Sequence, residues 1–168
     1  MAETSDGGGT ITGGRGRALE MMEKRVTPTL SLYLGYGAMA PLALAALAAW
    51  AFADPFAGMA ARVAVFWGGA LLLFLAGVRR GLSFRTPEGP RAPEIGAVFW
   101  LFGLALLALT LEDVMVSAAL LLVGFGSLAV IDPLAAWRGE APPFFARLRP
   151  VQMAIPAASF AGLLATQS

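Results

Sequence analysis

VAVFWGGALLLFLAGVRRG, residues Val63 to Gly81, is the stretch that decides the fold of this chain. Its first sixteen residues, Val63 to Val78, carry no charge, and Arg79 and Arg80 follow them directly. In helical conformation these residues cover about 24 Å at ~1.5 Å per residue. With amphipathic ends, such a helix can cross the roughly 30 Å hydrocarbon layer of a bilayer. Because paired arginines after an apolar run are typical of the cytoplasmic end of a span, the stretch predicts a membrane helix with a defined direction.

The composition indicates a membrane protein without reactive side chains. Of the 168 residues, 58% are hydrophobic and 14% are charged, whereas soluble domains have about 45–50% apolar and ~25% charged residues. The net charge of +1 argues against a nucleic-acid-binding surface. Cysteine and histidine are both absent. This excludes thiolate zinc sites, iron–sulfur sites, His-ligated haem and Ser/His/Asp catalysis. The sequence therefore predicts a protein that is not an enzyme, with no catalytic residue, metal site or cofactor.

The chain divides into a tail and a membrane domain. Residues 1–28 are polar and glycine-rich, which predicts a flexible tail, with a short interfacial helix at Arg17–Val26. Residues 29–168 are predicted to form an all-α bundle of five transmembrane helices. The predicted spans are about 30–53, 60–79, 94–111, 114–131 and 144–166. The fifth is the shortest apolar run and reaches the length of a span only when it is extended back to Phe144.

Prolines and acidic residues mark the predicted turns and kinks. Pro41 and Pro156 lie within the first and fifth spans, where each removes a backbone hydrogen bond and predicts a kink. Asp132–Pro133 is predicted to end the fourth span. Glu112–Asp113 leaves room for only a very short turn, so the third and fourth spans must be antiparallel neighbours. These two acids could hold a cation, but a polar turn explains them more simply.

The basic residues predict the orientation of the chain in the membrane. Eleven of the twelve lie on one side of the predicted spans, and Arg62 lies alone on the other. The eleven are Arg15, Arg17, Lys24, Arg25, Arg79, Arg80, Arg85, Arg91, Arg138, Arg147 and Arg149. The positive-inside rule then predicts a cytoplasmic N-terminus and an outside C-terminus. Because arginine is far commoner than lysine, as in GC-rich bacteria, we expect a bacterial inner membrane.

Small residues indicate where the predicted helices approach one another. Gly77 and Gly81 fit the small-xxx-small pattern that allows close helix contact. The predicted helix-packing glycines are Gly68, Gly69, Gly77, Gly81, Gly124 and Gly126. A ligand pocket beside these glycines is the alternative interpretation.

Charged residues are predicted to form a layer at the cytoplasmic ends of the spans. Its members are Arg79, Arg80, Asp132, Arg147 and Arg149. Their surplus positive charge predicts contact with anionic lipid headgroups or an acidic partner, with Asp132 bridging helix ends. Because the layer is expected to face water, each ion pair should contribute only ~0–1 kcal/mol. The alternative is that Arg79 and Arg80 only anchor the topology.

Three patches resemble the transmembrane protein 69-like family, which consists of small multi-span inner-membrane proteins with a domain of unknown function. They are LGYGAMAP (Leu34–Pro41), Trp67-Gly68 followed by FLAGVRRG (Phe74–Gly81), and PFFARLR (Pro143–Arg149). The chain departs from the family pattern at Ala76, where glycine is expected, and at Arg80, where tryptophan is expected. The resemblance implies a multi-span fold and an inner-membrane location, and it carries over no catalytic residue.

Together these observations predict a non-enzymatic accessory, assembly or stabilising component of a larger membrane complex. The expected partners are membrane lipids, including anionic ones, and another membrane protein. The alternative is a carrier or channel for a lipid or small molecule, which is favoured by the prolines within the first and fifth spans.

Overall fold

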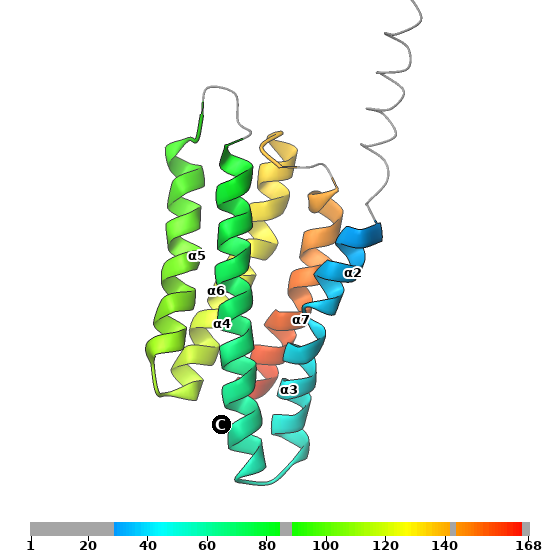
Figure 1. Ribbon diagram of the computed structural model, residues 1–168, viewed down its shortest axis with the longest axis vertical. Helices are drawn as coiled ribbons and strands as arrows, with labels where there is room; N and C mark the ends of the chain where they lie inside the picture. The colour runs from blue at the N-terminus through cyan, green and yellow to red at the C-terminus, as the bar shows by residue number, and fades with distance from the viewer. Residues whose placement is uncertain (1–28, 85–88, 142–143, 166–168) are drawn as a thin grey trace, which may run out of the picture.

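The computed structural model describes residues 29–84, 89–141 and 144–165, and every regular element within them is an α-helix. The helices are α2 (Thr29–Gly37), α3 (Ala40–Ala51), α4 (Phe56–Ser83), α5 (Ala92–Thr110), α6 (Val114–Trp137) and α7 (Phe145–Ala165). Figure 1 shows them packed side by side as one bundle, with α3 continuing α2 after a short break. The predicted all-α fold is confirmed for this part of the chain. The predicted tail 1–28, with its interfacial helix at Arg17–Val26, lies outside the described residues.

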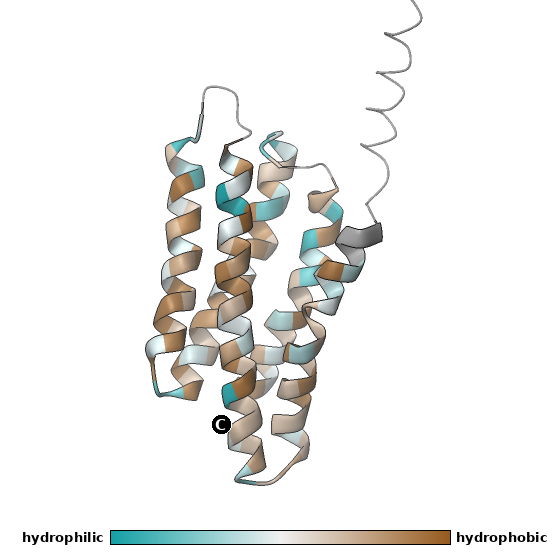
Figure 2. Cartoon of the chain, in the orientation of Figure 1, coloured by the Kyte–Doolittle hydropathy of each residue, from teal (hydrophilic) through white to brown (hydrophobic). Residues whose placement is uncertain are grey.

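The two ends of the bundle differ in charge. Helices α2, α5 and α7 begin, and α4 and α6 end, at what we call the arginine-rich end (Figure 1). The described basic residues there are Arg79, Arg80, Arg91, Arg138, Arg147 and Arg149. Arg62 lies near the opposite end, in the second turn of α4. Between the ends, the helix bodies are mostly hydrophobic (Figure 2).

In the part of the chain that the structure describes, four helical stretches are long and apolar enough to cross a membrane. They are the α2–α3 stretch Tyr33–Ala51, α4, α5 and α6. Their composition supports a multi-pass membrane protein. Helix α4 has 28 residues and is therefore about 42 Å long at ~1.5 Å per residue, which exceeds the roughly 30 Å hydrocarbon layer. Helix α4 therefore extends beyond the second predicted span, 60–79, at both ends.

The predicted fifth span corresponds to α7, but α7 is not one of the four candidate spans. Its first two turns contain Arg147, Arg149 and Gln152, which lower its hydropathy. Helix α7 nevertheless packs along α6, and Met153, Phe160 and other residues on that side are buried in the core. A fifth helix in the bundle is thus present, while five membrane crossings remain a prediction.

Helix α6 does not end at Asp132–Pro133, contrary to the prediction. It continues to Trp137, with Asp132 and Pro133 both buried inside it. The helix ends in a Schellman motif, in which Glu140 N donates to Ala135 O at 2.9 Å and Gly139 N donates to Ala136 O at 3.2 Å. Gly139 has a φ of +76°, which a residue without a Cβ adopts readily.

Pro41 interrupts the first span rather than merely bending it. It occupies the first turn of α3, which a proline tolerates because the amide hydrogens there have no intrahelical acceptor. The break leaves the Ala38 carbonyl free of the helix ladder, and Trp67 Nε1 of α4 donates to it at 2.8 Å. A neighbouring helix therefore satisfies the backbone group that the break exposes, as membrane interiors require. The other predicted kink, at Pro156, does not interrupt α7, which runs unbroken through Pro150 and Pro156.

Three of the six predicted packing glycines lie at close helix contacts. An added Cβ would collide with Phe160 at Gly68, with Leu109 at Gly69 and with Leu72 at Gly124. Phe160 cannot move aside easily, because it is fully buried and its ring stacks on Phe125 with centroids 6.1 Å apart. These glycines bring α4 close to α5, α6 and α7.

The other three glycines do not pack within the bundle. A Cβ at Gly77, Gly81 or Gly126 would meet no atom of the described residues within 4 Å. Gly77 and Gly81 are exposed on α4. A close contact at Gly77 and Gly81 is therefore not seen within the bundle, because this face of α4 points away from the other described helices.

Candidate functional site

A buried ionic cluster joins three helices near the arginine-rich end. Asp132 of α6 pairs through Oδ1 with Arg79 NH1 of α4, and its Oδ2 lies 3.1 Å from Arg149 Nε of α7. The side chains of Arg79, Asp132 and Arg149 are only 9%, 2% and 8% exposed. We call these three residues the Arg79–Asp132–Arg149 cluster. One carboxylate faces two guanidinium groups, so the cluster has a net charge of +1.

The burial of the cluster corrects the expectation of a water-exposed layer. Because α6 continues past Asp132 and α4 continues past Arg79 to Ser83, these side chains lie within the bundle rather than at its helix ends. Charged groups at such positions are costly to bury and are normally paired with one another. The weak contribution of ~0–1 kcal/mol that applies to exposed pairs therefore does not apply to Asp132.

Arg149 is oriented by several neighbours. Its NH1 donates to Gln152 Oε1 at 3.4 Å, and its guanidinium lies 4.5 Å from the centroid of the Phe145 ring. Its Nε lies at ion-pair distance from Asp132 but makes no hydrogen bond with any described group. Gln152 in turn packs against Gly35 of α2, where an added Cβ would overlap its side-chain amide.

Two arginines of the predicted layer lie outside the cluster. Arg80 NH1 donates to Ser83 Oγ at 3.0 Å, and its guanidinium lies 3.9 Å from the centroid of the Phe84 ring. Arg147 is exposed on α7. Consecutive helical residues point about 100° apart, so Arg79 and Arg80 cannot both face the core. The predicted layer is therefore divided into an inner cluster and outer arginines.

Two acidic residues for which the sequence predicted no role at a site lie near the cluster. Glu94 of α5 is buried, and its Oε2 accepts a hydrogen bond from Arg91 N at 3.4 Å. Glu140 Oε1 lies 3.7 Å from Arg91 NH1. Together with Arg79, Glu94 and Glu140 line a small hollow between α4, α5 and α6. The spacing of these two residues from Arg79 in the sequence does not predict that they lie close to it.

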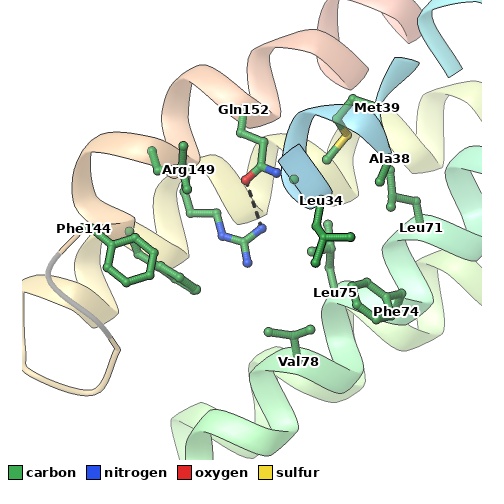
Figure 3. A pocket seen from close by; sticks show the side chains of 13 residues that line it. Leu34, Ala38, Met39, Leu71, Phe74, Leu75, Val78, Phe144, Arg149 and Gln152 are labelled. Atoms are coloured by element: carbon green, nitrogen blue, oxygen red, sulfur yellow. Dashed lines mark hydrogen bonds between the residues drawn. The ribbon is translucent and has the colours of Figure 1, made fainter. Parts of the chain in front are cut away.

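An apolar pocket with a volume of about 200 Å³ adjoins the cluster. It lies between α2, α4 and α7, and we call it the α2–α4–α7 pocket. Apolar side chains form most of its wall, and Arg149 and Gln152 are its polar members. Figure 3 shows the guanidinium of Arg149 pointing into the space between α7 and α4, opposite Val78 and Leu75. The pocket was not predicted, because its wall combines segments far apart in the sequence.

The acidic pair Glu112–Asp113 has a structural role at the opposite end. Asp113 caps α6, since its Oδ1 accepts hydrogen bonds from Met115 N at 2.8 Å and Val116 N at 3.1 Å. Such a cap satisfies backbone donors at the start of a helix. Among the described residues, no group of three acidic side chains is placed to hold a metal ion.

No known family model, curated protein or solved structure matches this chain. The resemblance to the transmembrane protein 69-like family therefore depends on the three sequence patches alone, and membership of that family stays a prediction.

Replacing Asp132 by Asn should destabilise the bundle by about 3–5 kcal/mol, because Arg79 and Arg149 would be left buried as unpaired like charges. Thermal unfolding in mild detergent would measure the loss. Glu112→Gln is the control, since this acid is exposed and surface changes usually stay within about 0.5 kcal/mol.

The triple variant Arg79→Gln, Asp132→Asn, Arg149→Gln should be more stable than Asp132→Asn alone, because no uncompensated charge remains. Equal stability of Asp132→Asn and the unmodified protein would show that the cluster is not a buried ionic contact.

Proposed function

We propose that this chain is a non-enzymatic integral membrane protein that serves as an accessory, assembly or stabilising component of a larger membrane complex. The observation that carries the proposal is the outward face of α4 at Gly77 and Gly81. This face has the small-xxx-small spacing of a helix contact, yet no described helix of the chain packs against it.

The neighbours of these glycines form a continuous stripe. Phe74, Gly77, Gly81 and Phe84 follow one another at intervals of three, four and three residues, so they share one face of a helix. Both phenylalanines are exposed. Large side chains on either side of two glycines create a shallow depression that a partner helix fits closely, with its backbone approaching Gly77 and Gly81.

A carrier or channel for a lipid or small molecule is the alternative function. It is favoured by the α2–α4–α7 pocket and by the break between α2 and α3, since interrupted helices frequently line transport sites. A transport function would require substrate flux across a sealed vesicle, whereas an accessory component would be defined by its partner.

We further propose that the arginine-rich end faces the cytoplasm and that the protein lies in a bacterial inner membrane. The charge difference between the two ends of the bundle supports this orientation, because basic residues near membrane helices are retained on the cytoplasmic side. Five crossings then place the end of α7 outside.

The orientation is tested by fusing a reporter that is active only in the periplasm. Fusion after Ser168 should give activity, and fusion after Gly89 should give none. Activity of the Gly89 fusion together with silence of the Ser168 fusion would reverse the proposed topology, and silence of both would indicate that α7 does not cross.

The partner face is tested with Gly77→Leu, which should reduce co-purification of a membrane partner in mild detergent by about tenfold, or 1.4 kcal/mol. A leucine there would hold the partner helix away, while the isolated protein should keep its melting temperature because the added side chain enters open space.

Gly103→Leu is the matched control. Gly103 is also an exposed helical glycine with open space around it, on α5, but residues 99 and 107 are Phe and Leu, so it lacks the small-xxx-small spacing. Quantitative mass spectrometry of the purified material would compare the variants. If Gly77→Leu and Gly103→Leu retain the same proteins in the same amounts as the unmodified chain, the α4 face is not a partner surface.

A further inference from the structure

We propose that the α2–α4–α7 pocket binds an anionic phospholipid, with part of one acyl chain along its apolar wall and the phosphate at Arg149. The inference goes beyond the proposed accessory function and does not depend on it. Phe74 belongs to both surfaces, but Gly77 and Gly81 do not line the pocket.

The size of the pocket fits part of a larger molecule. Its volume of about 200 Å³ is below the roughly 300–1,000 Å³ of sites that enclose a drug-sized ligand. Its wall runs along α4 from Val78 to Leu71, a length of about 10 Å at ~1.5 Å per residue. An acyl chain can lie along such a wall while the rest of the lipid stays in the bilayer.

The polar side of the pocket selects for negative charge. In the adjoining Arg79–Asp132–Arg149 cluster, one carboxylate is shared between two guanidinium groups. The carboxylates of Glu94 and Glu140 lie on the Arg79 side and do not line the pocket. The side chain of Arg149 is 92% buried, given its exposure of 8%. Its Nε faces Asp132 Oδ2 at 3.1 Å, while its guanidinium points into the pocket (Figure 3). A phosphate is the group that guanidinium binds best, through charge-assisted hydrogen bonds.

The position of Arg149 agrees with a lipid rather than with a soluble anion. It lies in the second turn of α7, near the arginine-rich end, which the proposed orientation places at the cytoplasmic headgroups. The apolar wall extends from there toward the middle of the bundle, as far as Met39 and Leu71. A phosphate at Arg149 and a chain directed toward Met39 would therefore have the orientation of a lipid in the adjacent leaflet.

The shape of the pocket is tested with a matched pair of substitutions. Leu34 lines the pocket and is 67% exposed, whereas Leu44 lies on α3 outside it and is 66% exposed. Protein reconstituted in nanodiscs of phosphatidylglycerol and phosphatidylcholine would be released and examined by native mass spectrometry. The unmodified protein should retain one phosphatidylglycerol. Leu34→Trp, or Val78→Phe as a second filling variant, should lower its occupancy about tenfold, and Leu44→Trp should leave it unchanged.

The charge of the site is tested separately. The triple variant Arg79→Gln, Asp132→Asn, Arg149→Gln removes the surplus charge and should retain phosphatidylglycerol and phosphatidylcholine equally. Arg147→Gln removes an exposed charge outside the pocket and should keep the preference for phosphatidylglycerol. Circular dichroism and thermal unfolding would confirm that each variant is folded.

Three results would overturn the inference. They are no retained lipid on the unmodified protein, equal retention of the two lipids by it, and a loss of phosphatidylglycerol from Arg147→Gln or Leu44→Trp as large as from the pocket variants. The last result would show that the lipid is retained by nonspecific attraction to the protein surface. Loss of a protein partner from Gly77→Leu is measured independently, so failure of one proposal can be distinguished from failure of the other.

Discussion

A single carboxylate shared by two arginines determines how the helices meet near the arginine-rich end of this bundle. Asp132, Arg79 and Arg149 come from α6, α4 and α7, so the charge of each can be compensated only when all three helices are in register. Apolar side chains contact one another almost equally well in shifted arrangements, and lipid tails are as apolar as leucine. A buried ionic contact penalises those alternatives, because any shift leaves a charge unpaired in a low-dielectric environment. We therefore assign the cluster a role in selecting one arrangement, rather than in adding much to total stability.

A buried backbone group in the first span also finds its partner on a neighbouring helix. Pro41 breaks the first span, and Trp67 of α4 satisfies the carbonyl of Ala38 at the break. Gly68 and Gly124 allow the helices to approach closely enough for such contacts to form. The two interactions hold α4 at different depths, one through the Trp67 indole bonded to Ala38 and one through Arg79 paired with Asp132. The inward face of α4 thus contacts other helices, while Gly77 and Gly81 on its outward face contact none of the described helices.

The helices themselves could be predicted from the sequence, but the residues that each helix contacts could not. Long apolar runs predicted α4 and α5 because hydropathy is a local property. The end of α6 was placed too early, since the rule that helices stop before proline is also local, while Asp132 is held by residues about fifty and seventeen positions away. Glycine spacing correctly marked Gly68 and Gly124, yet it could not tell which face of α4 points inward. The α2–α4–α7 pocket had no local signal, because three separate segments build its wall.

The role of the cluster in fixing the positions of α4 and α7 through Asp132 of α6 can be measured directly, because the chain has no cysteine and spin labels can be attached at chosen sites. Cysteines would replace Phe84 at the end of α4 and Val151 on α7, both of which are exposed. Double electron–electron resonance would then report the distribution of distances between the two helices. With Asp132 intact we expect one narrow distribution, and with Asp132→Asn a broad or shifted one. Identical narrow distributions for the two proteins would show that apolar packing alone sets the arrangement, and would contradict the role assigned to the Arg79–Asp132–Arg149 cluster.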